Sequence, residues 1–206
     1  MRCISVAVIL CLSAGLAFPA PPHDGNYPEE STGKRFVKHT FGLEAVGMAV
    51  AGAGMNQISN TPHEWGQGAV GFGRRFASAF GGHIVHNAIK YPVAKLLHEE
   101  FGYRPSNKQG FKPRLKYALL STFITHKTTT EQPTLAVGEI SGAVGAGLIS
   151  RLWQPKSVAS LGHGFASAGI VLSVDAGMNV VREFWPEIRH PHRHGAVTNT
   201  SSVSLR

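Results

Sequence analysis

The sequence predicts an all-α protein, a bundle of about five helices rich in glycine and alanine. Three observations point to this class. Apolar residues recur three and four positions apart over long stretches. Helix start and stop signals separate those stretches. No long run alternates apolar and polar residues in the way of a half-buried strand. The helical domain is expected at residues 34–188, and 43% hydrophobic residues allow it a core.

A leader is expected before the bundle. Residues 1–17 combine one basic residue, an apolar run and small residues before a cleavage point after Ala17, the pattern of a secretory signal peptide. Both cysteines, Cys3 and Cys11, fall in this segment, so the mature chain would have no disulfide and no cysteine ligand or nucleophile. Residues 18–33 are rich in Pro, Asn, Glu and Ser and are expected to form a disordered, extended linker.

The first two helices are expected at residues 36–56 and 61–91. The second opens with a capping box, Thr61 to Glu64, that has a proline at the first helical position. It then carries a stripe of residues at spacings of three and four, which predicts a core-facing side. The stripe consists of Trp65, Ala69, Phe72, Phe76, Phe80 and His83. Pro92 is expected to end or kink this helix.

A short amphipathic piece is expected at residues 93–101, after the kink. The remaining helices follow from similar signals and are expected at residues 113–126, 134–153 and 158–185. Pro155 and Pro186 supply stop signals after the last two, and Ser157 supplies a cap for the last one. Residues 127–133 are Thr-rich and read as a connection. Residues 189–206 are expected to form a disordered, basic tail that contains histidines.

The charge of the chain restricts its partners. Lys and Arg number 20 against 12 Asp and Glu, which gives +8, and loss of Arg2 with the leader leaves +7. A basic exported protein is expected to meet an anionic membrane surface or an envelope protein. Nucleic acid is not expected, because export removes the chain from it. No motif indicates a cofactor, and the sequence is compatible with a homo-oligomer.

One cluster of cations suggests where such a surface would be met. The cluster consists of Arg104, Lys108, Lys112, Arg114 and Lys116, with no acid among them. Tyr103 and Phe111 are suited to the interface beside it, and Arg74 and Arg75 are expected as further contacts with anionic surfaces. The alternative is a solvated loop kept soluble by its charge.

No metal site is expected, although two sets of histidines are candidate ligands for one. His83 and His86 lie three apart on a predicted helix, a spacing at which two imidazoles can share an ion. Structural histidines in and beside the core are the alternative. His190, His192 and His194 alternate in the tail and could hold divalent ions with low specificity. A solvated tail is the alternative for these three.

An enzyme is not the leading expectation. Lys95, Arg104, His163 and His190 follow one another in an order that resembles the PAP2-type phosphatases. In that family Lys and Arg grip a phosphate, one His attacks it and another protonates the leaving group. The spacings here depart from that pattern, since Lys95 and Arg104 lie two residues too far apart and Leu161 interrupts the expected Ser-Gly-His.

Small residues on helix faces leave a membrane alternative open. Gly138 and Gly142 lie four apart, as in membrane helices whose backbones approach closely. An ionisable group at a span centre costs about 3 kcal/mol, which favours a soluble or peripheral protein. In an integral bundle, however, the ionisable residues inside would be functional sites. Those residues are Glu44, Glu139, His163 and Asp175.

Several strings look familiar together. They are Glu64–Gly68, Gly71–Phe76, Leu115–Thr125 and Val181–Ile188. Over about residues 61–188 the chain resembles a family of uncharacterised exported bacterial proteins, found chiefly in acidobacterial-type genomes. The resemblance implies a Gram-negative envelope location and supplies no activity and no catalytic residue. The basic loop at 103–112 stands where that family is expected to have a shorter turn of the Asp-Pro-Arg-Tyr type.

The leading hypothesis is therefore non-enzymatic. We expect a structural or interaction protein in the periplasm or at the outer membrane, docked on an anionic membrane surface or on a partner protein. An integral helical bundle and a degenerate phosphatase are the alternatives.

Overall fold

The computed structural model describes residues 31–189, of which 71% are helical. The prediction of an all-α protein is confirmed at the level of class. The elements are α2 (Thr32–Phe41), α3 (Leu43–Ile58), η1 (His63–Trp65), α4 (Gly68–Leu96), α5 (Phe111–Leu120), β1 (Ile124–His126), β2 (Pro133–Leu135), α6 (Val137–Ile149), η2 (Ser150–Leu152) and α7 (Leu161–Arg189). The predicted signal peptide, most of the predicted linker and the tail histidines lie outside the described residues.

The first predicted helix is divided in two. Gly42 is extended, with ψ at 165°, and separates α2 from α3. A Cβ at this position would collide with the carbonyl oxygen of Lys38, so the break requires glycine. The helical region also starts before residue 34, because the hydroxyl of Ser31 accepts a hydrogen bond from the Lys34 N–H and caps α2.

The turn between α3 and α4 forms around one buried cation. Thr61 and Pro62 do not open a long helix as predicted; a short 3-10 helix follows, and α4 begins only at Gly68. The guanidinium of Arg75 donates to backbone carbonyls of this turn, and the residue is 1% exposed. Its carbonyl acceptors are Thr61, Pro62 and Gly66, at 2.9, 2.9 and 2.7 Å. Arg75 therefore cannot serve as the predicted contact with anionic surfaces, whereas Arg74 is exposed.

The prolines and the Thr-rich connection also differ from the prediction. Pro92 lies inside α4 and Pro186 inside α7. Each stands within the last turns of its helix, so the missing N–H costs a bond only near an end that frays. The helix predicted to reach residue 126 stops at Leu120, and β1 pairs antiparallel with β2 instead. An isolated bridge between Glu99 and Lys127 joins this hairpin to the segment after α4.

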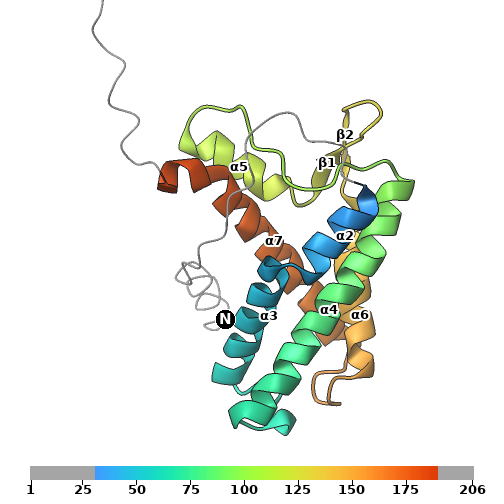
Figure 1. Cartoon of the computed structure of the whole chain (residues 1–206), viewed down its shortest axis with the longest axis vertical. Coiled ribbons are helices and arrows are strands. Elements are labelled where there is room, and N and C mark those ends of the chain that lie inside the picture. Colours follow the sequence, from blue (N-terminus) through green and yellow to red (C-terminus); the bar gives the residue numbers. More distant parts are fainter. Residues whose placement is uncertain (1–30, 190–206) are drawn as a thin grey trace, which may run out of the picture.

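Helix α6 lies between α4 and α7, antiparallel to both, while α3 packs on α4 and α5 on α7 (Figure 1). Glycines on α6 make the contacts. A Cβ at Gly138 would lie 2.8 Å from the Cβ of Ala94, near the end of α4. A Cβ at Gly147, at the other end of α6, would collide with the carbonyl oxygen of Gly164. The helices thus meet backbone to backbone, as the small faces of the sequence suggested.

The buried core consists mainly of small side chains. The buried hydrophobic residues are Ala45, Ala49, Ala53, Tyr91, Ala94, Ala118, Ala136, Ala143, Ala146 and Ala168. Large aliphatic side chains point outward, with Leu43 80% and Leu152 84% exposed. The aromatic stripe predicted for the core is only half-buried, and its member Ala69 is exposed. The reason is that glycine and alanine already fill the tight helix contacts, which leaves no space between helices for large rings.

The close contact between α6 and α7 gives a stability prediction. Gly147→Ala should destabilise the fold by about 1–3 kcal/mol, because its methyl group would meet the backbone of α7, which cannot move aside cheaply. Gly177→Ala is the matched control within α7. A Cβ there meets nothing within 4 Å, so this change should be neutral or stabilise by up to about 1 kcal/mol. Urea unfolding of the two variants measures both effects, and equal effects would contradict the packing.

Candidate functional site

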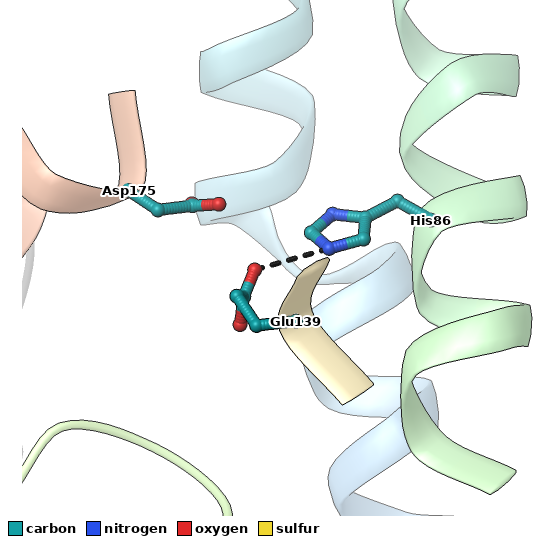
Figure 2. Close-up of side chains that lie close together, drawn as sticks. All are labelled: His86, Glu139 and Asp175. Carbon is teal, nitrogen blue, oxygen red and sulfur yellow. Dashed lines mark ion pairs between the residues drawn. The ribbon is translucent and has the colours of Figure 1, made fainter. Parts of the chain in front are cut away.

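Three helices bring ionisable side chains together in the centre of the molecule (Figure 2). His86 comes from α4, Glu139 from α6 and Asp175 from α7. One ligand-type atom from each lies within 4.8 Å of the other two. Asp175 points from α7 toward the pair formed by His86 and Glu139. Since these residues are 53 and 36 positions apart (139 − 86 and 175 − 139), only the packing of the helices unites them.

Glycines of α6 make room for this cluster. A Cβ at Gly142 would collide with the imidazole of His86 and would lie 2.8 Å from its carbonyl oxygen. A Cβ at Gly138 would lie 3.0 Å from the carbonyl oxygen of Lys90. His86 and Lys90 are one helical turn apart, so both face α6, where Glu139 stands between these glycines.

Glu139 interacts with both basic groups of α4. Its Oε1 lies 3.0 Å from Nε2 of His86, and its Oε2 forms an ion pair with the ammonium of Lys90. Burial opposes ionisation of Glu139, but the charge of Lys90 and the imidazole of His86 outweigh it and hold the pKa well below its usual range. The carboxylate is therefore ionised at neutral pH.

The pKa of Asp175 is shifted in the opposite direction. Burial, followed by the negative charge of Glu139, raises the pKa of Asp175 to about 7. Two neighbouring carboxyl groups thus differ in protonation near neutral pH, one ionised and one able to hold a proton. Pairs whose pKa values are pushed apart in this way are characteristic of functional sites.

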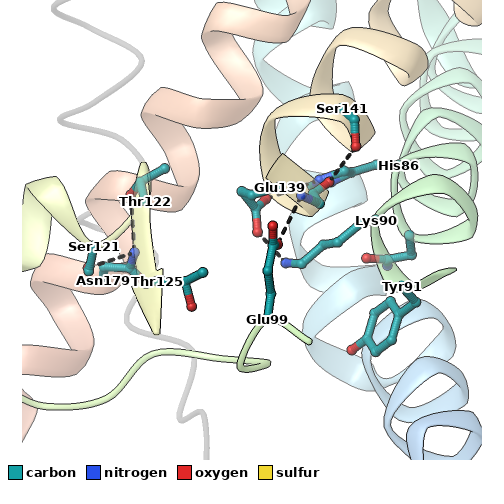
Figure 3. A network of polar contacts seen from close by, with 12 residues as sticks. His86, Lys90, Tyr91, Glu99, Ser121, Thr122, Thr125, Glu139, Ser141 and Asn179 are labelled. Carbon is teal, nitrogen blue, oxygen red and sulfur yellow. Dashed lines mark hydrogen bonds and ion pairs between the residues drawn. The ribbon is translucent and has the colours of Figure 1, made fainter. Parts of the chain in front are cut away.

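A cavity of about 80 Å³ adjoins the cluster, with room for several water molecules. Its wall contains both polar and apolar groups. The polar lining includes Lys90, Glu99, Thr122, Glu139, Asp175 and Asn179. Figure 3 shows Lys90, Glu99, Thr122, Glu139 and Asn179, which come from separate elements. Asn179 donates to the hydroxyls of Thr122 and Ser121, at 3.1 and 3.3 Å, which fixes the wall of the cavity formed by α7 and the turn before β1.

Glu99 orients the start of α6. Its buried carboxylate accepts the N–H groups of Val137 and Gly138, at 2.9 and 3.0 Å, and so caps the positive end of the helix dipole. The hairpin holds the neighbouring backbone, since the N–H of Glu100 donates to the carbonyl of His126 at 2.8 Å. No local pattern in the sequence signals this role, because the capping residue precedes its helix by 38 positions.

A second buried carboxylate fixes the basic loop on α7. Glu183 is 2% exposed and accepts hydrogen bonds from Tyr103, Ser106 and Arg114. The donors are the hydroxyl of Tyr103 at 2.6 Å, the N–H of Ser106 at 2.9 Å and Nε of Arg114 at 2.8 Å. Burial opposes ionisation, but these hydrogen bonds outweigh it and lower the pKa of Glu183 to about 2. Burial, together with Glu183, raises the pKa of Tyr103 in return.

The predicted basic cluster divides into a structural and an exposed part. Arg114 forms ion pairs with Glu183 and Glu187, so its charge is neutralised by carboxylates of the protein itself. Arg104 pairs with the half-exposed Glu100 at 3.0 Å. The remaining members are exposed: Lys108, Lys112 and Lys116. Nζ of Lys108 lies 5.4 Å from the ring centroid of Tyr117.

The histidine pair predicted from spacing does not share a site. Nε2 of His83 lies 3.0 Å from the carbonyl oxygen of His39 and 3.0 Å from Nδ2 of Asn87. Burial lowers the pKa of His83, which keeps it neutral. His86 alone of the pair joins the carboxylates, and His190, His192 and His194 lie outside the described residues.

The phosphatase residues that the structure describes are not brought together. Ala94, next to Lys95, contacts α6 at Gly138, whereas Gly164, next to His163, contacts it at Gly147. These contacts are about 13 Å apart along the helix. His163 instead lies with Nδ1 2.7 Å from the hydroxyl of Ser160 at the start of α7. His190 lies outside the described residues, so no phosphate grip is formed within residues 31–189.

Two of the four residues expected inside a membrane bundle do meet. Glu139 and Asp175 form the central cluster. Glu44 lies on the surface, where it forms a 2.8 Å ion pair with Arg182, and His163 is exposed. The clustering of His86 with these carboxylates, and the roles of Glu99 and Glu183, could not be found from local spacing.

Comparisons with protein-family models, with curated proteins and with solved structures found no match. The resemblance to exported bacterial proteins therefore stays a prediction.

The raised pKa of Asp175 gives a prediction of stability against pH. The folded pKa, about 7, lies above the unfolded value of 3.8, so the folded state binds the extra proton between them. The contribution of Asp175 to the free energy of unfolding is fully present below about pH 4 and is lost as the pH rises through 7. Asp175→Asn should remove that loss and stabilise the protein at pH 8 by about 1–3 kcal/mol. Urea unfolding at pH 5 and pH 8 measures this, and an equal effect at both pH values would contradict it.

Proposed function

We propose that the protein is an exported, envelope-associated helical interaction protein that docks on an anionic membrane surface through α5 and its flanking loop. One observation carries this proposal: exposed cations lie beside exposed large apolar side chains on α5 and on the segments directly before and after it. This α5 surface consists of Arg104, Lys108, Phe111, Lys112, Lys116, Leu119, Leu120 and Phe123.

The order of residues on α5 suits a membrane interface. Lys112 and Lys116 are one turn apart and exposed, and Leu119 and Leu120 continue the exposed side, each 43% exposed. Phe111, at the start of the helix, is 65% exposed. Long lysine side chains place their charge among headgroups while neighbouring rings and leucines enter the acyl boundary. A basic surface of this kind gains about 1 kcal/mol per cation near an anionic leaflet.

The α5 surface is held rigidly, which favours docking over a solvated loop. Arg114 on the inner side of α5 bonds Glu183, and its guanidinium lies 4.6 Å from the ring centroid of Phe184. The rings of Phe111 and Phe184 are 5.1 Å apart between centroids. In Figure 1, α5 lies against the C-terminal part of α7, away from α4 and α6. A helix that is already fixed in place loses little backbone entropy on binding.

One observation favours a second candidate, the integral bundle. Residues Leu161–Ile188 form a helix that is long and apolar enough to cross a membrane by length and composition. An 18-residue stretch of it has a mean hydropathy of 1.4, and 17% of that stretch is buried. Two facts weigh against it. Asp175 and Glu183 lie within this helix, and α6, its packing partner, spans only about 20 Å against a hydrocarbon thickness of about 30 Å. Peripheral docking is therefore the main proposal.

Charge reversal on α5 tests the proposal. Lys112→Glu with Lys116→Glu should weaken binding to vesicles of phosphatidylglycerol and phosphatidylcholine by about tenfold or more, because two charges change sign and the net charge of the surface falls by four units. Lys156→Glu, an exposed lysine in the loop before α7, is the control and should bind nearly as the native chain does. Vesicle flotation at about 0.05 and 0.5 M NaCl measures binding, which should fall with salt.

Three outcomes would contradict peripheral docking: no binding to anionic vesicles, binding that salt leaves unchanged, or an equal loss in the control variant. Retention of the chain in membranes after a carbonate wash would instead favour insertion through α7.

A further inference from the structure

We propose that His86, Glu139 and Asp175 bind one divalent transition-metal ion of the Zn²⁺ or Mn²⁺ kind. The three side chains supply one imidazole nitrogen and two carboxylate oxygens from three different helices. Zinc binds nitrogen and oxygen ligands at about 2.0–2.2 Å, so ligand atoms around one ion lie about 3–4 Å apart. The three atoms here are all within 4.8 Å, and small side-chain rotations close that difference.

The second observation is that the atoms at the centre of the cluster have no hydrogen-bond partner outside the cluster. Nε2 of His86, Oε1 of Glu139 and Oδ2 of Asp175 are all buried, and none bonds to any other part of the protein. Nε2 and Oε1 contact each other at 3.0 Å. His86 as a whole is 5% exposed. Buried polar atoms are nearly always satisfied in folded proteins, and a cation between these three atoms would satisfy all of them at once.

Lys90 does not exclude the ion. Its ammonium pairs with Oε2 of Glu139, whereas the unpartnered oxygen is Oε1. Glu139 can therefore bind the ion through one oxygen while the other remains with Lys90, an arrangement that orients a ligating carboxylate from outside the site. The nitrogen ligand and the absence of thiolate within the described residues favour zinc or manganese over calcium or a soft metal.

The adjoining cavity supplies access and a remaining coordination position. Glu139 and Asp175 belong to the cluster and also line the cavity of about 80 Å³. A water molecule in that space would complete a four-coordinate ion with three protein ligands, the arrangement of sites that keep one position open. Because the ligands come from α4, α6 and α7, binding would also clamp the three central helices together and stabilise the fold.

Zinc titration tests the proposal, with the tail histidines removed to isolate the site. The probe is Zn²⁺ added to the full mature chain carrying His190→Ala, His192→Ala and His194→Ala, followed by calorimetry and by thermal unfolding. We expect one ion per chain and a rise in melting temperature on binding. Added Asp175→Asn or His86→Gln should weaken binding at least tenfold and abolish the rise. His83→Ala, three positions from His86 and outside the cluster, should leave both readouts unchanged.

The proposal is overturned if the tail-free chain binds no Zn²⁺, or if Asp175→Asn and His86→Gln bind it as tightly as their parent. Should His86→Gln fail to fold, Asp175→Asn decides alone, because it keeps the size of the side chain and removes only the anionic ligand. Equal weakening by His83→Ala would also overturn the proposal, since it would show a general loss of structure.

Discussion

The close approach of α6 to α4 and α7 is the constraint on which the rest of the structure depends. Gly138 and Gly142 admit the backbone of α4, and Gly147 admits the backbone of α7. Glycine weakens an isolated helix, by about 1 kcal/mol per interior position relative to alanine. Its presence at these contacts is explained by geometry, because any Cβ there would meet a neighbouring backbone atom or the ring of His86.

This constraint determines what can hold the molecule together. Helices that meet through glycine and alanine bury little apolar area, so large side chains such as Leu43 and Leu152 remain outside. Buried charged groups then fix the segments between helices. Arg75 organises the turn before α4, Glu99 caps α6, and Glu183 binds the basic loop to α7. Each makes directional hydrogen bonds to backbone groups.

The helical class and the small helix faces could be predicted from the sequence, because both depend on local periodicity and side-chain size. The predicted helix ends and connections are wrong where long-range packing determines the structure. Pro92 and Pro186 stop no helix, and the Thr-rich connection becomes a hairpin that positions Glu99. The half-buried aromatic stripe shows that periodicity identifies a helix face but not what that face meets.

The candidate site shows the same division. Glu139 and Asp175 are notable from sequence alone as ionisable groups in apolar helices, and His86 as half of a histidine pair. Whether these three side chains meet depends on how three helices are aligned against one another, and no spacing along the chain shows that alignment. The spacing of His83 and His86 did not bring them to one site, because two different helices pack against this side of α4. His83 contacts the backbone of His39 in α2, whereas His86 contacts Glu139 in α6.

The two proposals rest on two separate parts of this architecture. The α5 surface faces outward and is suited to an anionic membrane, whereas the central cluster faces inward and is suited to a metal ion. Both depend on α7, which carries Asp175 at the cluster and Glu183 beneath α5. An ion bound at the centre would therefore strengthen the helix on which the α5 surface rests.

A double-mutant cycle between Gly142→Ala and His86→Ala tests the close approach of α4 and α6 most directly. Urea unfolding gives the free energy for the native chain, each variant and the pair. We expect Gly142→Ala to cost about 1–3 kcal/mol in the native background and less once the imidazole is gone, with a coupling energy of about 1 kcal/mol or more. Losses that add within about 0.5 kcal/mol would contradict it, because they would show that residue 142 and the imidazole of His86 do not meet.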